Sequence, residues 1–69
     1  MDLIDIDNNS VDVNISFDEL LVISNSLNEV CNGLDQFDFD IRMGVSNADV
    51  QALLSKVGSI IDALEKSKV

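Results

Sequence analysis

The sequence contains no histidine, no tryptophan and no tyrosine, and it has a single cysteine. Histidine is the side chain that most often acts as an acid or base near neutral pH, and no obvious base is present to activate Cys31 as a nucleophile. One cysteine cannot form a disulfide within the chain. We therefore expect a protein that is not an enzyme, with no catalytic residue, no cofactor and no disulfide framework.

Positive charge is scarce and is confined to the last part of the chain. The four lysine and arginine residues face thirteen aspartates and glutamates, for a net charge of −9, and the first of the four is Arg42. Ten of the thirteen acids precede Arg42, and three follow it. Self-repulsion of this size destabilises a small compact domain, and a cationic partner relieves it. We expect a basic protein partner, and we expect no direct binding of nucleic acid.

Long hydrophobic runs are also absent. No stretch approaches the roughly 20 apolar residues that a membrane-spanning helix needs, so no membrane partner is expected. The N-terminal residues Met1-Asp2-Leu3-Ile4-Asp5 are the opposite of the basic start of a secretory signal peptide. Together with the single cysteine, these features favour a cytoplasmic location.

Apolar residues, in contrast, make up 46% of the 69 residues and recur at regular intervals. Disordered acidic segments combine high charge with low hydrophobicity, so this chain differs from them. A chain of this length forms at most one domain and buries about 60% of its unfolded surface, which leaves a thin core. We expect one small folded domain over residues 1–69.

Apolar and polar residues alternate near the N-terminus, which is the period of a half-buried strand. The alternation is complete from 11 to 16 and is also present from 4 to 7, with turn-forming residues between the two runs. This pattern predicts a strand or hairpin over residues 1–16. The side chains expected to face inward are Val11, Val13 and Ile15.

Acidic residues would crowd the outer face of that hairpin. Asp5 and Asp7 would lie near Asp12, and like charges on neighbouring strands destabilise a sheet.

The run from Asp5 also begins like a calcium-binding EF-hand loop, with side-chain oxygens at its first, third and fifth positions. The match ends at Ser10, where the loop needs glycine, and at Ser16, where it needs glutamate. We therefore expect no metal site.

Two capping patterns predict where the main helices begin. In Ser16-Phe17-Asp18-Glu19, the serine hydroxyl and the glutamate carboxylate are placed to accept hydrogen bonds from backbone amides of the first turn. Ser46-Asn47-Ala48-Asp49 repeats the pattern. The helices predicted from these starts cover residues 17–32 and 47–66, with a short helix or turn over residues 35–43 between them.

Each main helix carries a stripe of apolar residues at spacings of three and four, which indicates its buried face. In the first helix the stripe consists of Leu20, Ile23, Leu27, Val30, Cys31 and Leu34. In the last helix it consists of Val50, Leu53, Leu54, Val57, Ile60, Ile61 and Leu64. Gly33 is predicted to end the first helix in a left-handed conformation. The predicted fold class is α+β, an N-terminal β-strand or β-hairpin packed on two main helices with a short connecting helix.

The segment around Gly44 resembles a helix-turn-helix, the corner that many DNA-binding domains use. The resemblance rests on the spacing of apolar residues about a glycine, at Phe39, Met43, Gly44, Val45, Val50 and Leu53. Asp40 occupies a position where the motif prefers a small residue, and no basic residue precedes Lys56 on the helix that would read DNA. A DNA-mimic or regulatory DNA-binding protein is one alternative, and a self-associating structural module is another.

Candidate contact residues lie on the back of the first helix and in the segment after it. Asp18, Val22, Asn25 and Glu29 recur at i, i+4, i+7 and i+11, opposite the buried stripe. Val22 is the apolar member of this set, which fits either an anchor at the centre of a contact surface or one of the single exposed apolar residues that are common on protein surfaces. The following segment adds Asp35, Asp38 and Asp40, with Phe37 and Phe39 between them. We expect one of these phenylalanines in the core, and we expect Arg42 to pair with Asp38 or Asp40.

In size, acidic charge and helical content, the whole chain resembles small bacterial immunity and antitoxin proteins, which bind a basic toxin domain and block its nucleic-acid site. The colicin DNase immunity family uses tyrosines in its contact surface, and this chain has none. The resemblance implies a non-enzymatic inhibitor of a basic toxin such as a nuclease. Steering suits that task, since oppositely charged proteins associate at rates up to about 10⁸–10⁹ M⁻¹s⁻¹ at low salt. The predicted partner-binding residues are Asp18, Val22, Asn25, Glu29, Asp35, Asp38 and Asp40.

Overall fold

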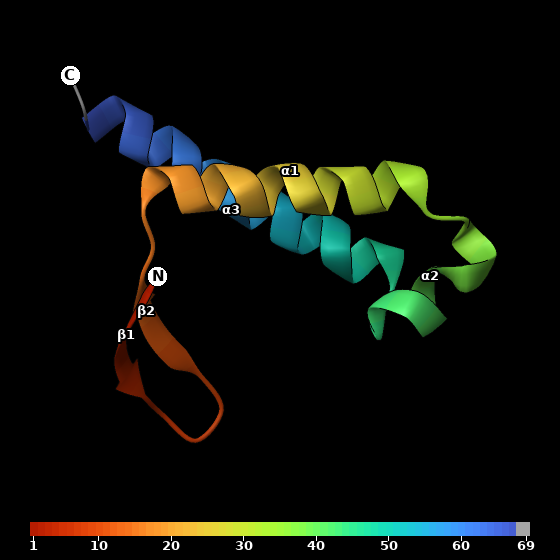
Figure 1. Cartoon of the computed structure of the whole chain (residues 1–69), viewed down its shortest axis with the longest axis horizontal. Coiled ribbons are helices and arrows are strands. Elements are labelled where there is room, and N and C mark those ends of the chain that lie inside the picture. Colours follow the sequence, from red (N-terminus) through yellow and green to blue (C-terminus); the bar gives the residue numbers. More distant parts are fainter. Residues whose placement is uncertain (68–69) are drawn as a thin grey trace.

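The computed structural model describes residues 1–67, with the side chains of residues 36 and 37 left aside. A hairpin of β1 (Asp2–Ile6) and β2 (Val11–Asn14) is followed by α1 (Phe17–Gly33), α2 (Gln36–Met43) and α3 (Asn47–Ser67) (Figure 1). This order confirms the predicted α+β fold class. The bounds of the three helices agree with the predicted ones to within one residue at each end.

The core lies between α1 and α3, which run side by side in opposite directions (Figure 1). Leu20 of α1 is buried with Val57 and Ile61 of α3, and half-buried side chains from both helices surround these three. The predicted stripe of α1 is confirmed, because its members are all buried or half-buried. None of the helices in residues 1–67 is both long enough and apolar enough to cross a membrane.

The stripe predicted for α3 was too wide. Leu53 and Ile60 were expected in the core, but 49% and 52% of their surfaces are exposed. The buried positions Val50, Val57 and Ile61 lie on the face that α1 and α2 contact. Leu53 and Ile60 lie seven residues apart on the flank of that face, and neither helix reaches far enough around α3 to cover them.

The side chain of Phe39 provides the second buried site, on α2. It is 1% exposed, and α2 packs on α3, so the expectation that one phenylalanine is in the core is confirmed. The other candidate, Phe37, lies outside the described side chains. Gly44 stands at the turn between α2 and α3 with a φ of 76°, a left-handed conformation that glycine adopts without steric strain.

The end of α1 differs from its prediction. Among the described residues the positive φ belongs to Gly44, so the left-handed stop predicted at Gly33 is wrong. The last residue of the helix is Gly33, and the residue that caps it, Leu34, has an extended backbone with a φ of −90° and a ψ of 140°. The Leu34 amide donates to the Val30 carbonyl at 3.3 Å, which satisfies the last turn without a left-handed residue.

The two predicted helix starts are confirmed by their capping hydrogen bonds. The Glu19 amide donates to Ser16 Oγ at 3.2 Å, and the Ser16 amide donates to Glu19 Oε1 at 3.0 Å, which is the full reciprocal box. At the start of α3, the Asp49 amide donates to Ser46 Oγ at 3.2 Å. Each hydroxyl satisfies an amide that has no partner within its own helix.

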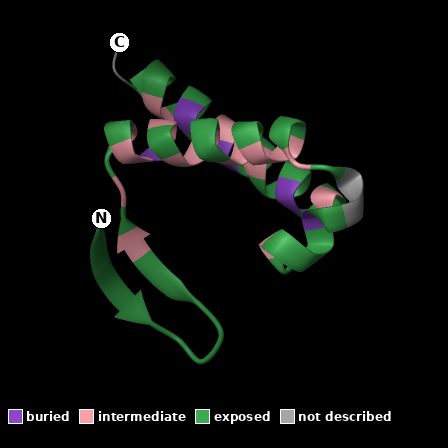
Figure 2. Cartoon of the chain, turned by 45° about the vertical axis from the view of Figure 1, so that its right-hand side comes forward, coloured by how far each residue is buried: buried purple, intermediate pink, exposed green. Residues whose placement is uncertain are grey.

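The hairpin extends away from the helices (Figure 1), and every residue of β1 is exposed (Figure 2). Val13 is half-buried, and Ile15, just after β2, packs against the helical core. Val11 was expected to face inward but is 56% exposed. The contact between hairpin and helices is therefore narrower than predicted, because β2 runs almost directly into α1 and leaves the hairpin tip away from the core.

Candidate functional site

The first candidate surface is the outer face of α1, formed by Asp18, Val22, Asn25 and Glu29. All four side chains are exposed, and Val22 is 65% exposed. The spacing of these residues places them along one side of the helix, whereas Leu20 on the other side is buried against α3. The structure therefore brings the four predicted residues onto one face that no other element covers in residues 1–67.

The second surface is the α2 acidic segment, formed by Asp35, Asp38 and Asp40, and all three residues are exposed. Asp38 lies in the first turn of α2, where negative charge suits the helix dipole. The segment lies at the end of α1 that is farther from the hairpin (Figure 1). Because α1 spans 17 residues, or about 25 Å, Asp18 and this segment lie at opposite ends of the helix.

Arg42 does not pair as predicted. It is exposed in the last turn of α2, and among residues with described side chains no carboxylate lies within ion-pair distance of it. The predicted pairing with Asp38 or Asp40 is therefore wrong. Surface ion pairs contribute roughly 0–1 kcal/mol, which is too little to hold a long arginine side chain in one conformation.

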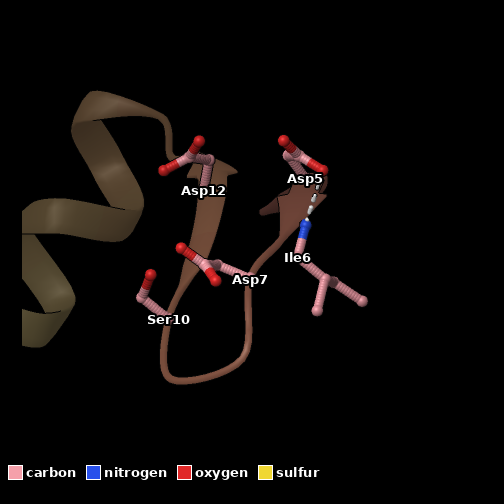
Figure 3. A pocket seen from close by; sticks show the side chains of 5 residues that line it. All are labelled: Asp5, Ile6, Asp7, Ser10 and Asp12. Atoms are coloured by element: carbon pink, nitrogen blue, oxygen red, sulfur yellow. Dashed lines mark hydrogen bonds between the residues drawn. The ribbon is translucent and has the colours of Figure 1, made fainter.

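A third acidic group lines a shallow pocket on the hairpin (Figure 3), with a volume of about 130 Å³. Its lining residues are Asp5, Ile6, Asp7, Ser10 and Asp12. Asp5 and Asp12 face each other across the two strands, which confirms the predicted crowding of like charges. No group of three or more candidate ligands among the described residues is arranged to hold a metal ion.

These hairpin carboxylates were not among the predicted partner-binding residues. The signal for them was present in the sequence, as aspartates on both sides of the Asn8-Asn9 turn. Two of them also organise the local backbone. Asp5 Oδ1 accepts from the Ile6 amide at 2.8 Å, and Asp7 Oδ1 accepts from the Asn8 amide. Their other oxygens contribute to the negative surface of the hairpin.

Glu19 is the acidic residue with a structural role. Its Oε2 forms an ion pair with the Met1 ammonium group, and its Oε1 accepts from the Ser16 amide. The hydrogen bond from the ammonium group, followed by those from Ser16, lowers the pKa of Glu19 to about 2. The charge of Glu19 is therefore neutralised within the molecule by the Met1 ammonium group.

Cys31 is free and half-buried between α1 and α3. It borders a shallow pocket of about 310 Å³ together with Asn28, Asn32, Gln51, Leu54 and Ser55. None of these neighbours can act as a base near neutral pH. The lining of this pocket therefore offers no side chain that would deprotonate the thiol near neutral pH.

Comparisons of the chain with family models, with curated proteins and with solved structures find no match. What the protein binds must therefore be inferred from its own exposed surfaces. The outer face of α1, the α2 acidic segment and the hairpin pocket are all acidic, and all precede Arg42. Their common chemistry is negative charge beside exposed apolar side chains.

Proposed function

We propose that this protein is a non-enzymatic acidic binding module, and specifically an immunity-type inhibitor that neutralises a basic toxin domain such as a nuclease. The observation that supports the proposal most directly is exposed Val22 among Asp18, Asn25 and Glu29 on the outer face of α1. An apolar anchor surrounded by polar residues is the usual composition of a protein interface. We assign binding to this face and to the α2 acidic segment.

The mechanism follows from charge. A nuclease attracts phosphates through a cationic cleft, so an acidic surface of comparable size competes for the same cleft. Long-range attraction accelerates the encounter, and the apolar anchor then slows dissociation. We place this function in the cytoplasm, and the free thiol of Cys31 suits the reducing conditions there.

The test is a double charge reversal, Asp18→Lys with Glu29→Lys, on the outer face of α1. The partner is captured from the native host on the immobilised wild-type chain, identified, and assayed for nuclease activity with and without the protein. We expect stoichiometric inhibition by the wild type. We expect the variant to bind at least about tenfold more weakly, with a flatter salt dependence, because two attractive charges have become repulsive.

A matched control reverses two exposed acids on a different helix, Asp62→Lys with Glu65→Lys on α3. Net charge changes equally in both variants, so any difference between them belongs to the outer face of α1. Equal affinities and equal salt slopes for the two variants would contradict the assigned surface. Capture of partners that are not basic, or that keep their activity when bound, would contradict the inhibitor assignment itself.

The corner between α2 and α3 supports a second candidate, a DNA-binding regulator, because Gly44 forms the left-handed turn that a helix-turn-helix requires. Charge argues against it. The first half of α3 carries Asp49 and no cation before Lys56, so a duplex would be repelled. We expect no shift of duplex DNA in an electrophoretic assay, and a clear shift at physiological salt would favour the regulator over the inhibitor.

A further inference from the structure

The hairpin has one apolar face and one acidic face, and a bulge brings Leu3 onto the apolar one. In the sequence Leu3 and Ile6 are three apart, so a regular strand would place them on opposite faces. The register shifts between Leu3 and Asp5, so that Leu3 pairs with Val13 and Ile6 pairs with Val11. Directly paired residues share a face, and all four are apolar.

The opposite face carries the polar partners. Asp5 pairs with Asp12, and Asp2 pairs with Asn14. The apolar face is not covered, since Leu3, Ile6 and Val11 are 58%, 66% and 56% exposed. A two-stranded hairpin is marginally stable alone, and exposed apolar residues in such a ribbon are typical of an interface.

A groove runs from this hairpin to the helices. It has a volume of about 420 Å³, and its lining is apolar except for Asp12. The lining residues are Val11, Asp12, Val13, Ile15, Leu20, Ile60 and Leu64. Consecutive residues of β2 form one wall, so the groove follows the outer edge of that strand. Across the groove lies Ile60, on the uncovered flank of α3.

The outer edge of β2 is free to pair. Among the described residues, the backbone hydrogen bonds outside the helices and the hairpin involve none of Val11–Asn14. Because β2 has one neighbour, β1, the backbone groups on its other side remain open to an added strand. A strand added there would lie in the groove and cover Val11, Val13 and Ile60.

We propose that this edge receives an extended segment of the basic partner in which apolar residues alternate with lysine or arginine. Side chains of an added strand point alternately to the two sides of the sheet. On one side they meet the apolar face and the groove, and on the other they meet Asp12, with Asp5 one strand farther away on the same face. This docking mode rests on the proposed function and adds a second contact to the outer face of α1.

A second copy of the chain fits this edge poorly. If two β2 strands paired with their apolar faces on the same side, Asp12 and the other acids of both hairpins would gather on the opposite side. Each chain also carries a net charge of −9. Self-pairing would extend the like-charge repulsion that already exists between Asp5 and Asp12, whereas a basic segment removes it.

The test uses two short synthetic peptides of identical composition. In the first, valine and lysine alternate, and in the second the valines are grouped at one end. Each is titrated into the isotope-labelled full chain and followed by NMR. We expect the alternating peptide to bind at least about tenfold more tightly. Its shifts should centre on the β2 amides and on Ile60, and β2 amides should exchange more slowly with solvent.

A matched pair of substitutions on α3 locates the site. Ile60→Lys places a cation in the groove and should weaken binding of the alternating peptide at least about tenfold, since it repels lysine and removes an apolar contact. Leu53→Lys introduces the same change at a similarly exposed position seven residues earlier, outside the groove, and should have little effect. Urea unfolding checks that both variants remain folded.

The outcomes separate this inference from the proposed function. Equal or absent binding of the two peptides, or shifts confined to α1 and α2, would overturn the edge-strand inference and leave the toxin assay unaffected. A dimer in sedimentation that Ile60→Lys abolishes would assign the groove to a second copy and also overturn it. The captured partner could bind the Asp18→Lys, Glu29→Lys variant with unchanged affinity while the alternating peptide still binds β2. That result would contradict the binding surface assigned to α1 and would support the groove beside β2.

Discussion

The helical part and the hairpin of this molecule are stabilised in different ways. The helices bury Leu20, Val57 and Ile61 in a shared core, and Phe39 is almost fully enclosed on α2. The hairpin contains no buried residue, and its two strands are joined mainly by backbone pairing. Figure 2 shows the contrast directly, since the buried positions all lie on the helices.

This difference indicates a division of labour within a small chain. Burial of apolar surface is the dominant stabilising term, so the global stability resides in the helices. The hairpin contributes exposed apolar and acidic surface instead. Segments with few buried contacts open locally at low free energy, so the hairpin is the part that should change conformation most easily.

The largest effect should come from removing the same side chain in each part. Leu20→Ala in the core should lower the free energy of unfolding by about 2–5 kcal/mol, because it leaves a cavity at a position that is 6% exposed. Leu3→Ala in the hairpin, at 58% exposure, should change it by less than about 0.5 kcal/mol. Urea unfolding measures both. If Leu3→Ala lowered the free energy of unfolding as much as Leu20→Ala does, the hairpin would have to be part of the helical core.

A second effect concerns backbone geometry at two glycines of the helical part. A methyl group added at Gly44 or at Gly58 would have no neighbouring atom within 4 Å apart from the adjacent backbone. Neither substitution therefore causes a steric clash, and the two differ only in backbone conformation. Gly44→Ala should lower stability by about 1–2 kcal/mol because of its positive φ. Gly58→Ala, inside α3, should raise stability by about 0.5–1 kcal/mol. If both substitutions changed the free energy of unfolding in the same direction, the left-handed conformation of Gly44 would be contradicted.

A smaller effect should appear in the hairpin alone. Asp12→Asn removes the like-charge pair with Asp5 and should stabilise the hairpin by up to about 1 kcal/mol. Hydrogen exchange of the strand amides should slow, while the urea midpoint of the helices stays unchanged. In molar salt the gain should shrink, because exposed charges are screened. Unchanged exchange at low salt would argue that the repulsion between Asp5 and Asp12 is negligible.

The smallest effect links the two parts through Glu19, whose carboxylate contacts both Met1 and the first turn of α1. Its pKa falls from 4.5 to about 2 in the folded state, so the folded protein binds fewer protons and this contribution increases with pH. The contribution of Glu19 to the free energy of unfolding is complete when the pH is above 4.5, the ordinary pKa of the group. It is lost as the pH falls through about 2, the pKa in the folded state. We expect the difference in Tm between wild type and Glu19→Gln to close between about pH 5 and pH 2. A constant difference would contradict the cause assigned to the shift.

Local sequence patterns were sufficient to predict the helices and strands, but they were not sufficient to predict which side chains a neighbouring element buries. The capping serines Ser16 and Ser46 act over three residues, so their helices begin where predicted. Leu53 and Ile60 follow the helical period equally well, yet they are half exposed because, within residues 1–67, no further element packs against that flank of α3. Periodicity identifies the apolar side of a helix but does not report how much of that side a neighbour reaches.

The candidate sites show the same limit. Helical spacing was enough to place Asp18, Val22, Asn25 and Glu29 on one exposed face, although their role in binding stays a prediction. The acidic outer face of the hairpin followed from the alternation, but the place of Leu3 on the apolar face was not predictable, because the bulge between Leu3 and Asp5 breaks the alternation there. A one-residue shift of register moves side chains to the other face, and strand pairing alone decides where that shift falls.

By itself the sequence determined the charge asymmetry, the α+β order of elements and the helix bounds, because these depend on composition and on contacts within a few residues. Tertiary structure decided that the hairpin extends from the helices, that Leu53 and Ile60 stay exposed, and that a groove opens beside β2. These features depend on how separate elements meet in space. The acidic first part of the chain thus becomes three distinct surfaces, one of which lies beside an apolar groove.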